Sequence, residues 1–400
     1  MNPMSNPLRL AGEPIAPPPG PAVLAMGFRP FFFAAALFGA VVIPLWIVMF
    51  TGHVPPGGGL PATWWHAHEM LYGYTAAVLV GFLLTAVRNW TGGHMTAANG
   101  ALGALVGLWV LGRVAHAPGV PGGWWSALPD MAFLLSTTFA IGRPLIKKGS
   151  RRNYGFLVAL PVMAAASLGL HIAASGGGAS LLRPSLDVPV AVMVGVMTIV
   201  AGRIVPMFTR NGLGVEFTRV APIEAVLPYA LAAVVAVAVL TLPAPVEAAV
   251  LVLAGALVLG RMAGWRSLQT FGAPLLWVLH IGHAWIGVGL ALQGAAALGW
   301  VSPSAGLHAI TAGAIGSLTV GMMARVSLGH TGRLLATSPM ITASLAFVVL
   351  AGALRVTAAF LPDIGPLLHS AGAAWSLSLL LWLLVYTPIV WRPRADGKPG

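Results

Sequence analysis

Long apolar segments separated by short polar breaks run along almost the whole chain. Breaks at proline, glycine and arginine clusters divide it into twelve segments at approximately 28–50, 63–87, 97–115, 124–146, 153–174, 188–208, 222–242, 246–263, 272–293, 305–326, 338–361 and 366–391. An apolar run of about 20 residues crosses the hydrocarbon core as a helix, whereas barrel strands alternate polar and apolar residues over about 10. The pattern therefore predicts an all-α, polytopic transmembrane bundle of about twelve spans.

The composition supports this class. The chain is 58% hydrophobic and 8% charged, whereas soluble domains carry roughly 25% charged residues. A formal net charge of +12 would fit a nucleic-acid partner, but the basic residues lie in short loops between apolar segments, where they act as topology signals. The composition thus predicts a lipid bilayer as the surroundings and excludes nucleic acid as a partner.

The distribution of basic residues predicts the orientation. Of 21 Lys and Arg residues, 18 lie on one side of a twelve-span arrangement, and Arg113, Arg183 and Arg355 lie on the other. Because basic loops stay in the cytoplasm, both termini are predicted to be cytoplasmic. Residues 1–27 are predicted to form a disordered tail, 28–391 a single transmembrane domain and 392–400 a second tail. No internal repeat stands out by eye.

Histidine is the candidate ligand for any metal. The chain has eleven histidines and no cysteine, so thiolate sites, iron–sulfur clusters and covalently attached haem are excluded. The second span opens with TWWHAHEM and places His66, His68 and Glu69 near the outer interface. At 100° per residue, His66 and Glu69 project on similar sides and His68 points elsewhere. One ion would take both histidines only if the turn is irregular.

The other intramembrane polar residues sort by predicted depth. His280 and His283 lie three residues apart near the midplane, His308 lies near the outer interface, and His330 lies at the cytoplasmic edge. Ordinary hydrogen bonding between helices is the alternative for each of them. Another three histidines end spans on the outer side and are predicted to be interfacial residues rather than ligands: His116, His171 and His369.

Two acidic residues are predicted to lie within the outer half of the spans. Ionisable groups inside a membrane are functional candidates by default, and these two are Glu69 and Asp130. A carboxylate beside imidazoles could accept a proton, orient a ligand or pair with a buried arginine such as Arg113.

Three strings together carry a family resemblance: HAHEMLYGY with GFLLTAVRNWTG in residues 66–92, GRIVPMFTRNGL in 202–213 and HAITAGAIGSLTVGMMARVSLGHTGR in 308–333. They resemble the signature segments of the NnrS family. The family comprises haem- and copper-containing membrane proteins tied to bacterial nitric oxide metabolism, denitrification and resistance to nitrosative stress. The resemblance covers about residues 28–391 and implies a twelve-helix, multi-pass protein of the bacterial inner membrane.

The resemblance also implies roles for particular residues. His66, His68 and Glu69 match the family's H-x-H-E-M element, His308 and His330 its final histidine elements, and His280 its LH pair. Arg113 matches the LGR element and Arg203 the GR-x-V/I-P element. We expect His280 or His308 to ligate haem, of b type, and His66 and His68, with His283, to hold copper. Arg113 would pair with a haem propionate, and Glu69 and Asp130 would relay protons.

Two functions follow as hypotheses. Adjacent haem and copper would couple two nitric oxide molecules to nitrous oxide, which makes the protein an oxidoreductase supplied by an unidentified electron donor; distant metals favour binding or sensing of nitric oxide. The alternative is a twelve-helix secondary transporter, in which the histidines form a substrate, copper or proton site.

Overall fold

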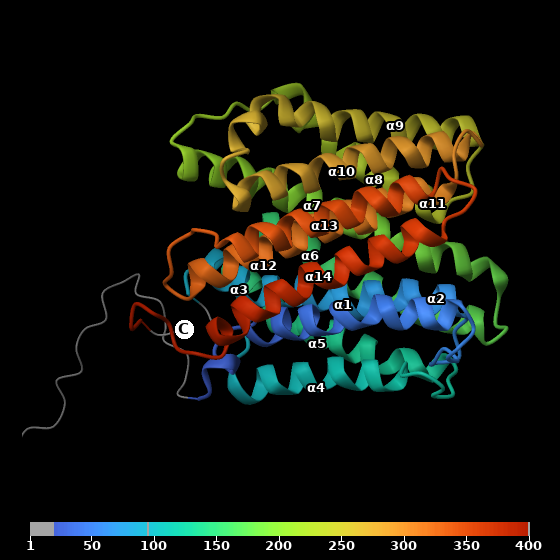
Figure 1. The fold of residues 1–400 in the computed structure, drawn as a ribbon, viewed down its shortest axis with the longest axis horizontal. Coiled ribbons are helices and arrows are strands. Elements are labelled where there is room, and N and C mark those ends of the chain that lie inside the picture. Colours follow the sequence, from blue (N-terminus) through green and yellow to red (C-terminus); the bar gives the residue numbers. More distant parts are fainter. Residues whose placement is uncertain (1–19, 94–95, 399–400) are drawn as a thin grey trace, which may run out of the picture.

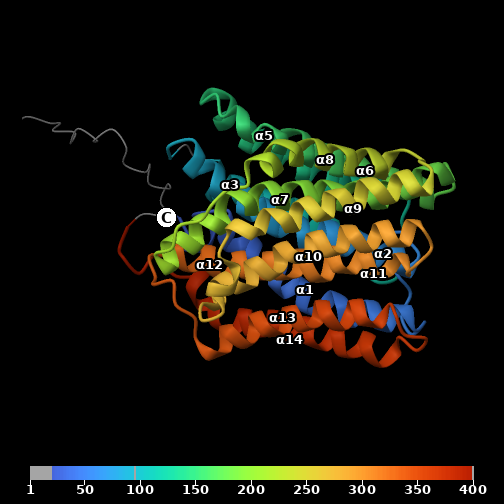
Figure 2. The ribbon, with the colours of Figure 1, turned by 90° about the horizontal axis from the view of Figure 1, so that it is seen from above.

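The computed structural model describes residues 20–93 and 96–398. Its helices run side by side along the longest axis of the molecule (Figures 1 and 2). The main elements are α1 (Phe28–Phe50), α2 (Ala62–His68), the π-helix η2 (Glu69–Thr75), α3 (Ala76–Trp90), α4 (Asn99–Ala115), α5 (Leu128–Lys147), α6 (Gly155–Ala174), α7 (Leu182–Leu213), α8 (Ala221–Val239), α9 (Ala244–Arg261), α10 (Pro274–Ala297), α11 (Pro303–His308), the π-helix η8 (Ala309–Ile315), α12 (Gly316–His330), α13 (Pro339–Ala358) and α14 (Gly365–Val390).

Two of the continuous helices contain a π-helical turn. η2 joins α2 to α3, and η8 joins α11 to α12. The part of the chain that the structure describes therefore holds twelve continuous long helices, of which ten are long and apolar enough to cross a bilayer. The other two are α4, which is shorter, and α5, which carries Asp130 and Arg143. The all-helical, multi-pass class is confirmed, whereas the number of spans stays a prediction.

The helices form a closed ring of three four-helix units. The first unit contains α1 to α5, the second α6 to α9 and the third α10 to α14. In each unit the last helix packs against the first helix of the next unit: α5 against α6, α9 against α10, and α14 against α1. The second helix of each unit is the longest of its four helices. Parts of these second helices, in α3, α7 and α12, line one shared cavity.

The sequence carries a trace of this repetition that inspection by eye missed. His68 directly precedes η2 and His308 directly precedes η8. Gly73 and Gly313, Val80 and Val320, Gly81 and Gly321, Thr91 and Thr331, and Gly92 and Gly332 all recur at the same separation of 240 residues. The first and third units thus share a sequence pattern around one of their buried helices.

Both described ends of the chain lie at the same end of the bundle. Arg29 donates from Nη1 to the carbonyl oxygens of Val390 (2.9 Å) and Arg392 (2.7 Å). We call this the inner end and the opposite one, where α2 begins, the outer end, following the predicted orientation. Of the two predicted tails, residues 1–19 and 399–400 lie outside the described residues. The described part of the second tail folds back, since Ala395 donates to the Thr331 carbonyl.

Candidate metal centre

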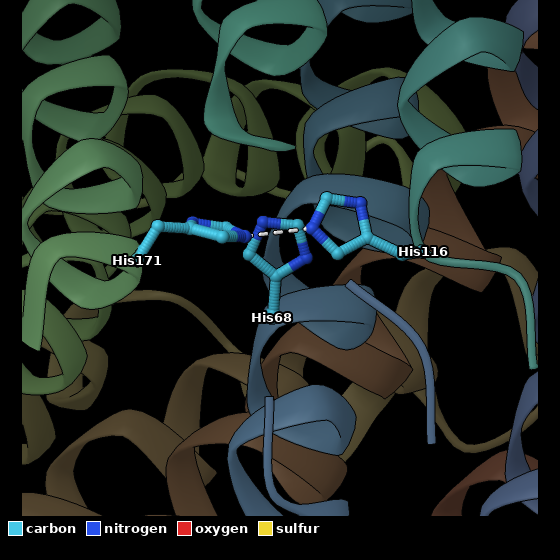
Figure 3. A group of neighbouring side chains, drawn as sticks. All are labelled: His68, His116 and His171. Atoms are coloured by element: carbon cyan, nitrogen blue, oxygen red, sulfur yellow. Dashed lines mark hydrogen bonds between the residues drawn. The ribbon is translucent and has the colours of Figure 1, made fainter. Parts of the chain in front are cut away.

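Three buried histidines meet at the outer end of the first and second units. His68 ends α2, His116 follows α4, and His171 lies in the last turn of α6. One ring nitrogen of each lies within 4.8 Å of the others, and the exposed fractions are 0%, 0% and 1%. Figure 3 shows the rings converging from separate helices. Side chains of this kind at this spacing could hold one metal ion.

The hydrogen bonds of two rings fix their tautomers. His116 Nδ1 lies 2.8 Å from the carbonyl oxygen of Gly112, and His171 Nδ1 lies 2.8 Å from that of Ser167. A carbonyl only accepts, so each Nδ1 carries the proton and each neutral ring presents an Nε2 lone pair. These two Nε2 atoms lie 2.8 Å apart. Two facing lone pairs repel, so the pair requires a shared cation, either a proton or a metal ion.

The third ring repeats this arrangement with a carboxylate. His68 Nδ1 lies 2.9 Å from Glu69 Oε1, and His68 Nε2 faces Ser167 Oγ and Asp130 Oδ2, both at 3.4 Å. When Glu69 is ionised, Nδ1 donates and Nε2 keeps its lone pair. Metal-binding histidines commonly donate their second nitrogen to a carboxylate or a backbone carbonyl in this way.

Arg113 ties the two carboxylates together. Its Nη1 lies 2.7 Å from Glu69 Oε1 and its Nη2 lies 2.5 Å from Asp130 Oδ1. Both carboxylates are 1% exposed at their side chains. One guanidinium against two ionised carboxylates leaves a net charge of −1, and a buried unbalanced charge is costly. The centre therefore favours a bound cation over an anion.

A glycine-rich segment, residues 57–59, packs against His116 at the outer end, and we call it the glycine cap. Gly58 has a φ of +67°, a conformation that suits glycine, and a Cβ there would overlap the His116 ring. Its backbone nitrogen donates to the Val120 carbonyl at 2.9 Å. On the other flank, Trp65 Nε1 donates to the His116 carbonyl at 2.7 Å. These contacts hold His116 in place.

The donor set suits a transition metal that takes imidazole ligands, such as copper or zinc. Nitrogen ligands about 2.0 Å from a tetrahedral ion lie roughly 3.3 Å apart. Because the two Nε2 atoms lie 2.8 Å apart, binding would move the rings of His116 and His171 apart by roughly 0.5 Å. The carboxylate of Asp130 lies beside the three rings, with Oδ2 3.4 Å from His68 Nε2, and could serve as a further ligand.

The structure does not bring His66 into this group. Its ring stacks on Trp46 with centroids 4.2 Å apart, and its Nδ1 is buried without a hydrogen bond. It lies within electrostatic range of His308. His308 Nδ1 lies 2.9 Å from the Ser304 carbonyl, and Arg355 Nη2 donates to Ser304 Oγ at 3.0 Å. His66 of the first unit and His308 of the third unit thus lie near each other, and we call them the second histidine pair.

The midplane histidines lie apart from both groups. His280 Nε2 contacts Thr209 Oγ1 and its Nδ1 contacts Ser267 Oγ, each at 2.8 Å. His283 is fully buried against Trp265, with ring centroids 4.6 Å apart, and neither ring nitrogen has a hydrogen bond. His283 therefore does not join His66 and His68 around one ion.

Two further predicted residues lie at the inner end. Arg203 Nη1 donates to Asn153 Oδ1 at 2.8 Å, and His330 packs against Phe28 with ring centroids 5.8 Å apart. Neither contacts the three-histidine centre. The expected pairing of Arg113 with a haem propionate also meets competition, since both ends of its guanidinium are engaged by carboxylates.

Sequence reasoning missed two members of the centre. The expectation that His116 and His171 are interfacial was wrong, because both are buried; His369 is exposed, as expected. The available signal was their shared position with His68 at the outer ends of their spans. The predicted split between His68 and Glu69 was also wrong, because His68 Nδ1 lies 2.9 Å from Glu69 Oε1 and both side chains join one cluster.

The fold and site define a multi-pass helical membrane protein with a buried three-histidine centre. The chain matches the family model described as NnrS protein over residues 22–394, and it therefore belongs to the NnrS family. No curated protein matches the chain.

Proposed function

We propose that this NnrS protein is a copper- and haem-containing protein of the bacterial inner membrane that binds nitric oxide and reduces it, which protects against nitrosative stress. The observation that carries the proposal is the three-histidine centre, in which two Nε2 lone pairs face each other at 2.8 Å. Family membership supports the choice of copper and nitric oxide.

The three-histidine centre is the copper site in this proposal. His68, His116 and His171 hold the ion through nitrogen atoms whose opposite ring positions are fixed by Glu69, Gly112 and Ser167. Copper bound there supplies a redox-active centre for nitric oxide. With both carboxylates ionised, the surrounding side chains would carry a net charge of −1, which a monovalent cation such as reduced copper would balance.

The carboxylates are placed to handle protons. Reduction of two nitric oxide molecules to nitrous oxide and water consumes two protons and two electrons. Asp130 Oδ2 lies 3.4 Å from His68 Nε2, and Glu69 lies one hydrogen bond from the same ring. Asp130 is therefore close enough to pass a proton to a group bound beside His68 Nε2, whereas Glu69 lies at the opposite nitrogen of that ring and would accept or return a proton there. Arg113 fixes their orientation, and an unidentified donor supplies the electrons.

Haem is assigned to the second histidine pair. His308 donates from Nδ1 to Ser304, so its Nε2 is free of a proton and suits an axial ligand. Arg355 is next to Ser304, and no carboxylate pairs with it within residues 20–93 and 96–398, so it could take a propionate. His280 fits less well, since hydroxyl groups engage both of its nitrogens. The lack of cysteine implies non-covalent haem.

The test is an anaerobic optical titration of the purified protein with nitric oxide, with iron, copper and nitrous oxide measured on the same sample. We expect one copper and one haem per chain, a Soret band that shifts with nitric oxide, and release of nitrous oxide. The H171A variant should lose copper and keep the Soret band, and H308A should do the reverse. Protein without iron or redox change, but able to move copper into sealed vesicles, would instead establish the transporter.

A further inference from the structure

A second polar site lies at the inner end of the bundle, whereas the three-histidine centre lies at the outer end. A cavity of about 650 Å³ opens between the end of α7, the start of α10, the end of α12 and the loop that leads to α13. Its walls include Phe208, Asn211, Leu276, Arg325, His330 and Leu335. Ligand cavities commonly have volumes of about 300–1,000 Å³, so this one is large enough for the head of a lipid-sized molecule.

Arg325 gives the cavity its charge. The residue is 8% exposed, and its guanidinium carbon lies 3.9 Å from the centroid of the Phe208 ring. Among the described residues no carboxylate forms an ion pair with Arg325. A buried cation without a counter-charge is costly, and a negatively charged group in the cavity would remove that cost. The cavity therefore favours an anion.

The surroundings of the cavity are apolar. One helical turn deeper on the same three helices, Val205, Leu279 and Met322 line a smaller cavity whose exposed surface is entirely apolar. At the mouth, Leu335 lines the cavity while half exposed, and its neighbour Leu334 is 87% exposed. Apolar side chains at such a rim are unfavourable in water and favourable in a membrane interface. The cavity thus opens toward lipid.

We propose that this cavity binds one anionic phospholipid, with the phosphate at Arg325 and the acyl chains against the apolar rim. His330 and Asn211 supply further polar contacts for the head group. The predicted orientation puts the cavity at the cytoplasmic interface, where anionic lipids are attracted to basic protein surfaces. This lipid site is independent of the proposed metal chemistry and does not share a residue with the three-histidine centre.

The test is native mass spectrometry of the full-length protein after removal of lipid, with phosphatidylglycerol or phosphatidylcholine of matched chains added back. Wild-type protein should retain one phosphatidylglycerol with about a tenfold preference over phosphatidylcholine, because both lipids carry a phosphate but the choline cation of phosphatidylcholine opposes the positive charge of Arg325. R325Q should lose the preference. R210Q should keep it, because Arg210 is an exposed inner-end arginine that faces a different phenylalanine, Phe217.

A second variant covers the case in which R325Q fails to fold. Ala336 lines the cavity but is exposed, so A336W should fill the cavity without disturbing the core, and it should abolish retention of the lipid while the copper content stays normal. The proposal is overturned if A336W and R325Q retain phosphatidylglycerol as wild type does, if wild type binds both lipids equally, or if a quinone occupies the site in an Arg325-dependent manner in place of phospholipid.

Discussion

The first and third units place similar residues at the outer end but balance their charge differently. In the first unit His68 precedes a π-turn and Arg113 ends the following helix; in the third, His308 and Arg355 hold the corresponding places. Arg113 is paired with two carboxylates, whereas Arg355 donates to the hydroxyl of Ser304.

That difference decides what each unit can bind. Two carboxylates against one guanidinium favour a cation in the first unit, and the neighbouring imidazoles could hold a metal ion there. A guanidinium without a carboxylate makes the third unit suitable for a ligand that carries negative charge. In the proposed function, one structural pattern would therefore hold two kinds of cofactor, because two acidic residues pair with the arginine in one copy and no carboxylate pairs with it in the other.

Among the tests of this difference between the units, removal of one imidazole from the first unit should have the largest effect, on the affinity for copper. In H116A the copper affinity should fall by more than about 100-fold, since loss of a supporting residue alone typically costs 10–100-fold. Metal analysis after dialysis against a chelator measures this. The matched control is H369A, which removes an exposed histidine at the same end. Equal copper in H116A and H369A would contradict the assignment.

Removal of the guanidinium should cost more stability in the first unit, at Arg113, than in the third unit, at Arg355. R113M leaves Glu69 and Asp130 buried without a counter-charge and should lower the free energy of unfolding by roughly 3–5 kcal/mol. R355M loses one hydrogen bond and should cost about 1 kcal/mol. Thermal unfolding in the same detergent compares the two variants. Equal losses would show that charge balance does not distinguish these units.

Substitution in the glycine cap should have a moderate effect. Gly58 lies in the glycine cap, and Gly52, outside it, is the matched control because both have positive φ. A Cβ at Gly52 meets open space, whereas one at Gly58 overlaps the His116 ring. G52A should cost about 1–2 kcal/mol through its backbone alone. G58A should cost a further 1–3 kcal/mol from crowding and weaken copper binding by about tenfold. If both variants bind copper equally, the cap does not position His116.

The ion pair in the second tail should matter least. A hydrogen bond from Arg394 lowers the pKa of Asp396, a residue at the surface. A lowered pKa contributes stability that is present above the ordinary aspartate value and is lost as the pH falls through the lowered one. Because exposed ion pairs contribute little, D396N should leave the unfolding temperature at neutral pH unchanged. A clear decrease would mean that the tail supports the inner end.

The sequence was sufficient for the fold class, because apolar length and basic-residue placement act along the chain. It gave the ends of most helices to within a few residues, although α7 begins at Leu182 rather than at the predicted 188. It could not group the histidines, since His68, His116 and His171 come from separate elements and meet only in the packed tertiary structure. The helical-wheel argument separated His68 from Glu69 because it considered only the direction in which each residue leaves the helix, whereas the two neighbouring side chains turn toward each other.

The most direct test is X-ray absorption at the copper edge of the anaerobically purified protein. The account predicts one copper per chain with three imidazole nitrogens at about 2.0 Å, loss of the bound copper in H171A and an unchanged spectrum in H66A. Copper with fewer than three imidazoles, or a spectrum that changes in H66A and not in H171A, would contradict the three-histidine centre.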